Sequence, residues 1–75
     1  MTDTKLLQKC IQDTGVKKVY LEHKLGLSHQ GFYNKLVGKS EFTVKEITIL
    51  CELLNINRSL REKIFFATNV DEKST

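Results

Sequence analysis

The tetrapeptide Leu25-Gly26-Leu27-Ser28 constrains the fold of this chain more than any other feature, because it can end one helix and begin the next. Glycine readily adopts the left-handed conformation that closes a helix, and serine is a preferred cap for the first amides of a helix. The sequence therefore predicts a helix over residues 16–25 and another over residues 28–37, joined by a tight turn.

The segment SHQGFYNKLV forms a helix with two different faces. Phe32 and Leu36 lie four residues apart and point to the same side. The opening turns on the other side carry hydrogen-bonding side chains, namely His29, Gln30, Tyr33 and Asn34. One face can pack against protein while the other reaches base edges in a DNA major groove. Gly31 is a poor helix former, and we attribute it to close approach of the helix backbone to DNA or to the preceding helix.

The rest of the chain also reads as helical, because proline is absent, glycine is sparse and no run alternates with the period of a strand. Asp3 or Thr4 can cap a first helix that runs through Thr14 and ends at Gly15. The apolar contacts of the 16–25 helix are predicted to come from Val19, Leu21 and Leu25.

Two later segments have the spacing of a capping box. Thr43 and Glu46 predict a fourth helix from residue 44, and Ser59 and Glu62 predict a fifth that starts at the serine. The apolar stripe of the fourth helix is predicted to consist of Val44, Ile47, Leu50, Cys51 and Leu54.

Size and composition favour a small binding module. A chain of 75 residues can bury only about 60% of its unfolded surface, which leaves little room for an enclosed catalytic pocket. Cys10 and Cys51 fall on apolar helix faces and read as reduced core residues. The N-terminal segment MTDTKLLQKC lacks the apolar run of a signal peptide, and no segment approaches a membrane helix. We expect a soluble protein without a membrane partner, located in the cytoplasm.

Neither catalysis nor metal binding is predicted. His23 stands beside Glu22, but neighbouring residues of a helix point about 100° apart and do not converge on one ligand. The two histidines and two cysteines are too widely separated for a zinc constellation or a nucleophile–base pair. We therefore expect no enzyme activity, no metal and no cofactor.

Positive charge is concentrated between residues 16 and 45, where Glu22 and Glu41 are the only acidic residues. The lysines of this segment are Lys17, Lys18, Lys24, Lys35, Lys39 and Lys45. The segment before it is balanced, and the segment after it is slightly acidic. Such an excess suits a phosphate backbone, because each neutralised phosphate adds affinity through counterion release. The alternative is an ordinary solvated surface with scattered lysines.

The segment LEHKLGLSHQGFYNKLVGKSEFTVKEITILCELL resembles the helix-turn-helix core of small phage Cro and repressor proteins and their bacterial relatives. The resemblance extends from about Leu6 to Ala67, and the ending EKIFFA is similar to small regulators from phages of Gram-positive bacteria. It implies an all-α, five-helix, lambda-repressor-like domain over residues 1–70, followed by a polar tail over residues 71–75. It also implies location in a bacterial host cell, with the nucleoid.

The resemblance places the DNA contacts on particular residues. By position, the base-reading residues fall on His29, Gln30, Tyr33 and Asn34. A phosphate contact at the start of the second helix falls on Lys17 or Lys18. The other predicted phosphate contacts are Ser28, Lys35, Lys39 and Ser40. Two positions differ from the family pattern, because Glu22 replaces a common alanine and Lys35 replaces a common buried apolar residue, which can alter how the two helices cross.

Two functions follow from these features. The first is a Cro-like repressor that binds a double-stranded DNA operator as a homodimer, because one module of this size buries too little surface for tight operator binding. The exposed member of the Phe65–Phe66 pair is the expected dimer contact, since adjacent aromatics on a helix cannot both face one core. The second is an antirepressor or modulator that docks onto another repressor protein. Replacement of Gln30 and Asn34 by alanine would abolish only the first activity.

Overall fold

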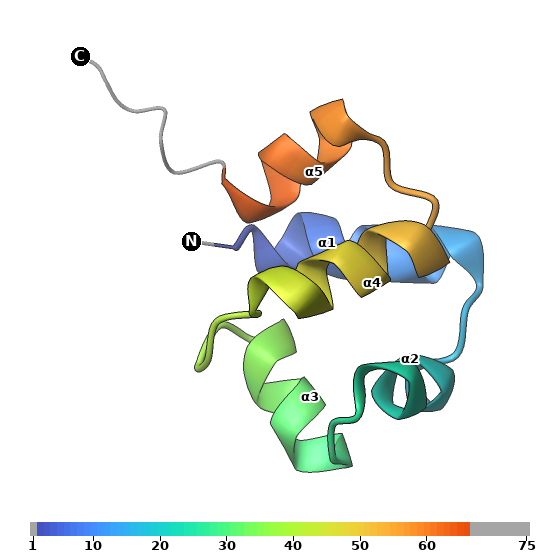
Figure 1. Ribbon diagram of the computed structural model, residues 1–75, viewed down its shortest axis with the longest axis vertical. Coiled ribbons are helices and arrows are strands. Elements are labelled where there is room, and N and C mark those ends of the chain that lie inside the picture. Colours follow the sequence, from blue (N-terminus) through green and yellow to red (C-terminus); the bar gives the residue numbers. More distant parts are fainter. Residues whose placement is uncertain (1, 67–75) are drawn as a thin grey trace.

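The computed structural model describes residues 2–66, and this part of the chain consists of five α-helices without a strand (Figure 1). The helices are α1 (Thr4–Thr14), α2 (Lys18–Leu25), α3 (His29–Leu36), α4 (Val44–Leu53) and α5 (Arg58–Phe65). The predicted all-α fold is confirmed over these residues. The expected end of the domain at residues 67–70 and the polar tail at 71–75 lie outside the described residues.

Helix α4 crosses the middle of the structure (Figure 1). In that view α5 lies on one side of α4, α2 and α3 lie on the other, and α1 lies behind it. Helix α2 packs against both α3 and α4, while α1 contacts α3 and α5. This arrangement places α2 and α3 together at the end of the molecule away from α5.

The ends of α1 and the start of α4 agree with the sequence prediction. The side chain of Asp3 accepts a hydrogen bond from the Leu6 amide, and Gly15 closes α1 with a φ of 76°. Thr43 and Glu46 form the predicted capping box, in which each side chain accepts a hydrogen bond from the other residue's amide. Local capping chemistry therefore fixes these boundaries.

Two predicted helix starts were wrong. Helix α5 is capped by Asn57, whose Oδ1 accepts a hydrogen bond from the Leu60 amide at 2.8 Å, and not by Ser59, which lies inside the helix. Helix α2 begins at Lys18 and not at residue 16, because Lys17 has an extended backbone with φ −74° and ψ 139°. Both starts therefore depend on the backbone conformation of the preceding loop.

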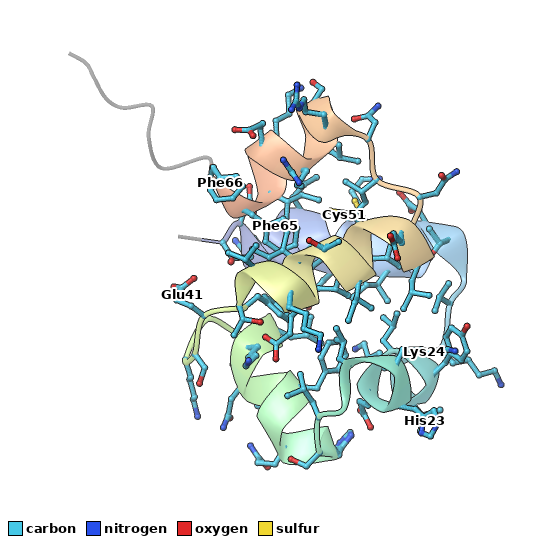
Figure 2. All side chains as sticks on the ribbon, in the orientation of Figure 1. His23, Lys24, Glu41, Cys51, Phe65 and Phe66 are labelled. Atoms are coloured by element: carbon cyan, nitrogen blue, oxygen red, sulfur yellow. The ribbon has the colours of Figure 1, made fainter. Side chains whose placement is uncertain are left out.

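The core gathers apolar side chains from all five helices and their connections, namely Leu7, Ile11, Leu21, Phe32, Leu36, Phe42, Ile47, Leu50, Leu54, Ile56, Ile64 and Phe65. Cys10 and Cys51 are unbonded thiols that pack at the core's edge, and burial raises the pKa of both. In Figure 2, Cys51 lies between α4 and α5.

Two valines predicted to face the core are exposed instead. Val19 is 66% exposed, because residues two apart on a helix point about 200° apart and Leu21 occupies the inward side of α2. Val44 is 80% exposed. It shares a face with Ile47, but as the first residue of α4 it lies past the edge of the core, where no described element covers it.

The adjacent phenylalanines of α5 have different surroundings. Phe65 is 3% exposed and packs edge-to-face against Phe42, which makes a similar contact with Phe32. Phe66 is 38% exposed and projects from the end of α5 (Figure 2). The prediction that the two residues cannot both enter the core is confirmed, and Phe65 is thereby removed as a candidate dimer contact.

Candidate nucleic-acid interface

The turn between α2 and α3 has the geometry that its sequence predicts. Gly26 adopts a left-handed conformation with a φ of 70°, and the Leu27 amide donates a hydrogen bond back to the Glu22 carbonyl oxygen at 3.0 Å. The Ser28 hydroxyl oxygen then caps α3 by accepting a hydrogen bond from the Gly31 amide at 3.0 Å. Both helix ends are satisfied within a short connection, which sets α3 directly after α2.

Gly31 lies against the cap of α3 and not against α2, which corrects its attribution to close approach of the preceding helix, while close approach to DNA stays a prediction. A Cβ atom at this position would lie 3.1 Å from the Ser28 hydroxyl oxygen, and no other described neighbour outside the helix backbone lies within 4 Å. The glycine therefore leaves room for the capping hydroxyl.

Helix α3 has the two faces that its sequence predicts. Phe32 and Leu36 are buried, and the Leu36 carbonyl oxygen accepts a hydrogen bond from the Gln8 side chain of α1 at 3.1 Å. The four predicted base-contacting residues lie on the outer side, with His29, Gln30 and Tyr33 exposed and Asn34 half-buried. The structure therefore brings these four side chains together on one helix.

Gln30 and Asn34 are hydrogen-bonded to each other. The Gln30 Nε2 donates to the Asn34 Oδ1 at 3.0 Å, across one turn of α3. A glutamine has two amide hydrogens and a carbonyl oxygen, so this bond leaves an acceptor and a donor on Gln30 unused. The pairing restricts the Gln30 side chain and leaves its remaining polar atoms at the surface.

His29 is held by Glu22 of α2. The His29 Nδ1 lies 2.8 Å from the Glu22 Oε2, and the carboxylate is the buried partner, since the His29 side chain is 86% exposed and that of Glu22 is 11% exposed. His23, the sequence neighbour of Glu22, projects away from the body of the molecule beside Lys24 (Figure 2). The pair is not evident in the sequence, because its members lie seven residues apart in different helices.

Lys35 does not face solvent, which corrects its prediction as a phosphate contact. Its Nζ lies 2.5 Å from the Glu46 Oε1 of α4, and the side chains are only 15% and 13% exposed. Burial alone would raise the pKa of Glu46, but hydrogen bonds from Lys35 and from the Thr43 amide, together with the lysine charge, hold the pKa below its ordinary value. The lysine is thus committed to a contact within the protein.

The other predicted phosphate-binding lysines are exposed around α2 and α3. Lys18 borders a hollow of about 260 Å³ between these helices, together with His29 and Tyr33. Lys17 is the N-cap residue of α2 and supplies no side-chain hydrogen bond to the helix amides. After α3, the amides of Lys39 and Ser40 both donate to the Asn34 carbonyl oxygen, which holds this loop against the end of the helix.

Residues 2–66 contain neither a metal-binding cluster nor a membrane-spanning helix. No three His, Cys, Asp or Glu side chains within that range gather as a metal ion would require. Among the same residues, none of the helices has the length and apolar character needed to cross a membrane. The sequence matches no known family model, and neither curated proteins nor solved structures include a significant match.

Proposed function

We propose that this protein is a sequence-specific DNA-binding regulator that inserts α3 into the major groove, in the manner of the Cro and repressor proteins that its sequence resembles. The main support is the exposure of polar side chains along α3, which is packed through its other face on the core. A helix held in this way presents base-reading groups without exposing an apolar face.

The Gln30–Asn34 pair suits recognition of adenine. In the major groove adenine presents the N6 amino group as a donor and N7 as an acceptor. The carbonyl oxygen and the remaining N–H of Gln30 supply the complementary acceptor and donor, while Asn34 restrains the side chain from behind. A restrained glutamine loses less conformational entropy on binding than a free one.

The charge around α3 suits contacts with the DNA backbone. Lys35 and Glu22 are paired within the protein, with Glu46 and His29 respectively. The exposed charged residues that remain between residues 16 and 45 are Lys17, Lys18, Lys24, Lys39, Lys45 and Glu41. The positive excess therefore persists after the internal pairs are removed, and each lysine that meets a phosphate adds salt-dependent affinity.

Three features support phosphate contacts on both sides of α3. The first amides of α2 lack a side-chain cap and carry Lys17 and Lys18 beside them, which is an arrangement that attracts an anion. The Ser28 hydroxyl oxygen accepts a bond from the helix, but its hydrogen remains able to donate. On the far side, Lys39 and Ser40 extend from the end of α3.

We further propose that two copies bind neighbouring half-sites about one helical turn of DNA apart. Phe66 supplies an exposed aromatic surface at the end of α5 for contact between copies. Phe66 lies on the opposite side of α4 from α3 (Figure 2), so a contact there leaves the DNA-facing helix accessible.

The proposal is tested by selecting bound sites from random duplex DNA at two salt concentrations. The native chain is compared with Gln30→Ala/Asn34→Ala, and Lys9→Ala/Asp13→Ala serves as a control because it removes an exposed pair of the same spacing from α1. We expect a two-fold symmetric motif with the native and control chains and its loss with the α3 variant. Weak, unselective, salt-sensitive binding by the native chain would contradict the proposal and favour docking onto another repressor protein.

A further inference from the structure

The Glu22–His29 contact joins a buried carboxylate to an exposed ring at the start of α3. Glu22 is the only buried charged residue in the described part of the chain, and its position on α2 lies directly behind the first residue of α3. The ring is anchored at one nitrogen, while most of its surface faces solvent. A contact of this kind fixes the orientation of the imidazole.

The contact also fixes which ring nitrogen carries hydrogen. A carboxylate can only accept hydrogen bonds, so the nitrogen 2.8 Å from it, Nδ1, must be the donor. In a neutral imidazole the other nitrogen, Nε2, then has a free lone pair and acts as an acceptor. His29 is thereby selected as one of its two tautomers.

We propose that Glu22 is a positioning residue that makes His29 read a base through an accepting Nε2, so that His29 selects bases with an amino group in the major groove. Adenine and cytosine present such groups at N6 and N4, whereas guanine and thymine present acceptor oxygens that an unprotonated Nε2 repels. This inference rests on the proposed DNA-binding function and assigns Glu22 a part in its specificity.

The surroundings of the pair are consistent with this role. The hollow beside His29 is bordered by Lys18 and Glu22 of α2 and by Tyr33 of α3, and its floor includes Phe32 and Leu36. Lys18 can only donate and therefore does not compete with the ring for the base amino group. The acceptor of the hydrogen bond that orients the ring belongs to α2, so base reading by α3 depends on the helix packed against it.

The first part of the test is the tautomer in the DNA-free protein. Imidazole nitrogen chemical shifts, measured at alkaline pH where the rings are neutral, distinguish a nitrogen that carries hydrogen from one that does not. We expect Nδ1 of His29 to carry hydrogen in the native chain and to lose this preference in Glu22→Ala. His23, which is exposed and forms no side-chain hydrogen bond or ion pair within residues 2–66, is the internal reference. A native His29 protonated at Nε2 would overturn the inference whatever the DNA results.

The second part is site selection at the same pH with native protein, Glu22→Gln, Glu22→Ala and His29→Ala. At one position in each half-site, the native chain should prefer adenine or cytosine over guanine or thymine. Glu22→Ala should reduce that preference by about fivefold, the factor that corresponds to one hydrogen bond of about 1 kcal/mol, and leave other positions unchanged. Glu22→Gln should reduce it by less, because its amide can either accept a hydrogen bond from Nδ1 or donate one to it. Glu22→Ala should have no further effect in a His29→Ala background, because Glu22 acts through the ring.

The outcomes separate this inference from the proposed function. One result is that the native chain selects a motif whose base preferences stay the same in the Glu22 variants, or weaken equally at every position. Either form of this result would overturn the role of Glu22 but would leave the proposal that α3 reads DNA intact. No selected motif with the native chain would overturn the DNA-binding function and the specificity role together. Thermal unfolding of each variant establishes that it is folded under the selection conditions, and Glu22→Gln preserves the size of the buried side chain.

Discussion

Lys35 of α3 and Glu46 of α4 form an ion pair that is largely shielded from solvent, with Nζ 2.5 Å from Oε1. The same carboxylate accepts a hydrogen bond from the Thr43 amide and completes the capping box of α4. The Lys35 Nζ also lies over the Phe42 ring, 5.9 Å from the ring centroid. The Glu46 side chain therefore completes the cap of α4 and also holds the end of α3 against this helix.

Loss of Glu46 should be more harmful than loss of Lys35. Glu46→Ala removes the carboxylate half of the capping box, while Thr43 still caps the helix, and it leaves the Lys35 ammonium shielded without its partner. We therefore expect the free energy of unfolding to fall by about 3 kcal/mol. Lys35→Met retains the apolar stem and leaves the Thr43 amide bonded to Glu46, so we expect a loss of about 1 kcal/mol. Urea unfolding measures both, with exposed Glu52→Ala as a control on the same helix. Equal losses for the two variants would contradict this account of Glu46.

The pH dependence of stability should reflect Glu46. Because its folded-state pKa lies below its ordinary value of 4.5, the pair contributes stability above that value and loses it as the pH falls through the folded-state pKa. Glu46→Gln removes this titration, so its urea midpoint should fall less than that of the native chain between neutral pH and strongly acidic pH. An identical fall in both chains would show that Glu46 does not contribute to acid sensitivity.

The start of α5 gives a matched test of helix capping. Asn57→Ala removes the side chain that accepts from the Leu60 amide and should reduce the free energy of unfolding by about 1 kcal/mol. Ser59→Ala lies two residues away and should change it by less than about 0.5 kcal/mol. The urea unfolding midpoints of the two variants show which residue caps α5. A larger loss of stability in Ser59→Ala than in Asn57→Ala would mean that the helix begins at the serine, as predicted from sequence.

The phenylalanines at the end of α5 should separate stability from association. Phe65→Ala empties part of the core and should reduce the free energy of unfolding by about 3 to 5 kcal/mol. Phe66→Ala should leave stability nearly unchanged but weaken cooperative binding to a two-half-site duplex. Unfolding measurements and DNA titrations are made on the same samples. If Phe66→Ala binds the two-half-site duplex with the same cooperativity as the native chain, Phe66 is not part of the contact between copies.

Much of the helix layout could be predicted from local chemistry. Asp3, Gly15, Gly26, Ser28 and Thr43 each act on amides or carbonyls only a few residues away, so their roles are legible in sequence. The predicted start of α5 was wrong, because residues 59–62 have the spacing of a capping box although the residue that caps the helix is Asn57, two positions earlier.

The unpredicted features are contacts between helices. Glu22 pairs with His29 and Lys35 pairs with Glu46 across turns, and these pairings depend on how the helices pack. The sequence predicts a phosphate contact for Lys35, because the charge of this residue, but not its partner, is visible there. The exposure of Val44 has the same cause, since an apolar residue is buried only where another element covers it. The exposure of Val19, in contrast, follows from helix periodicity once Leu21 faces the core.

The central claim is that α3 meets DNA, and backbone amide chemical shifts recorded while duplex DNA is added test it most directly. The account predicts that the largest changes fall at residues 17–18, at the first two turns of α3 and at residues 39–40, with little change along α5. Changes centred on Phe66 and α5, with the α3 amides unaffected, or no change at any amide, would contradict it.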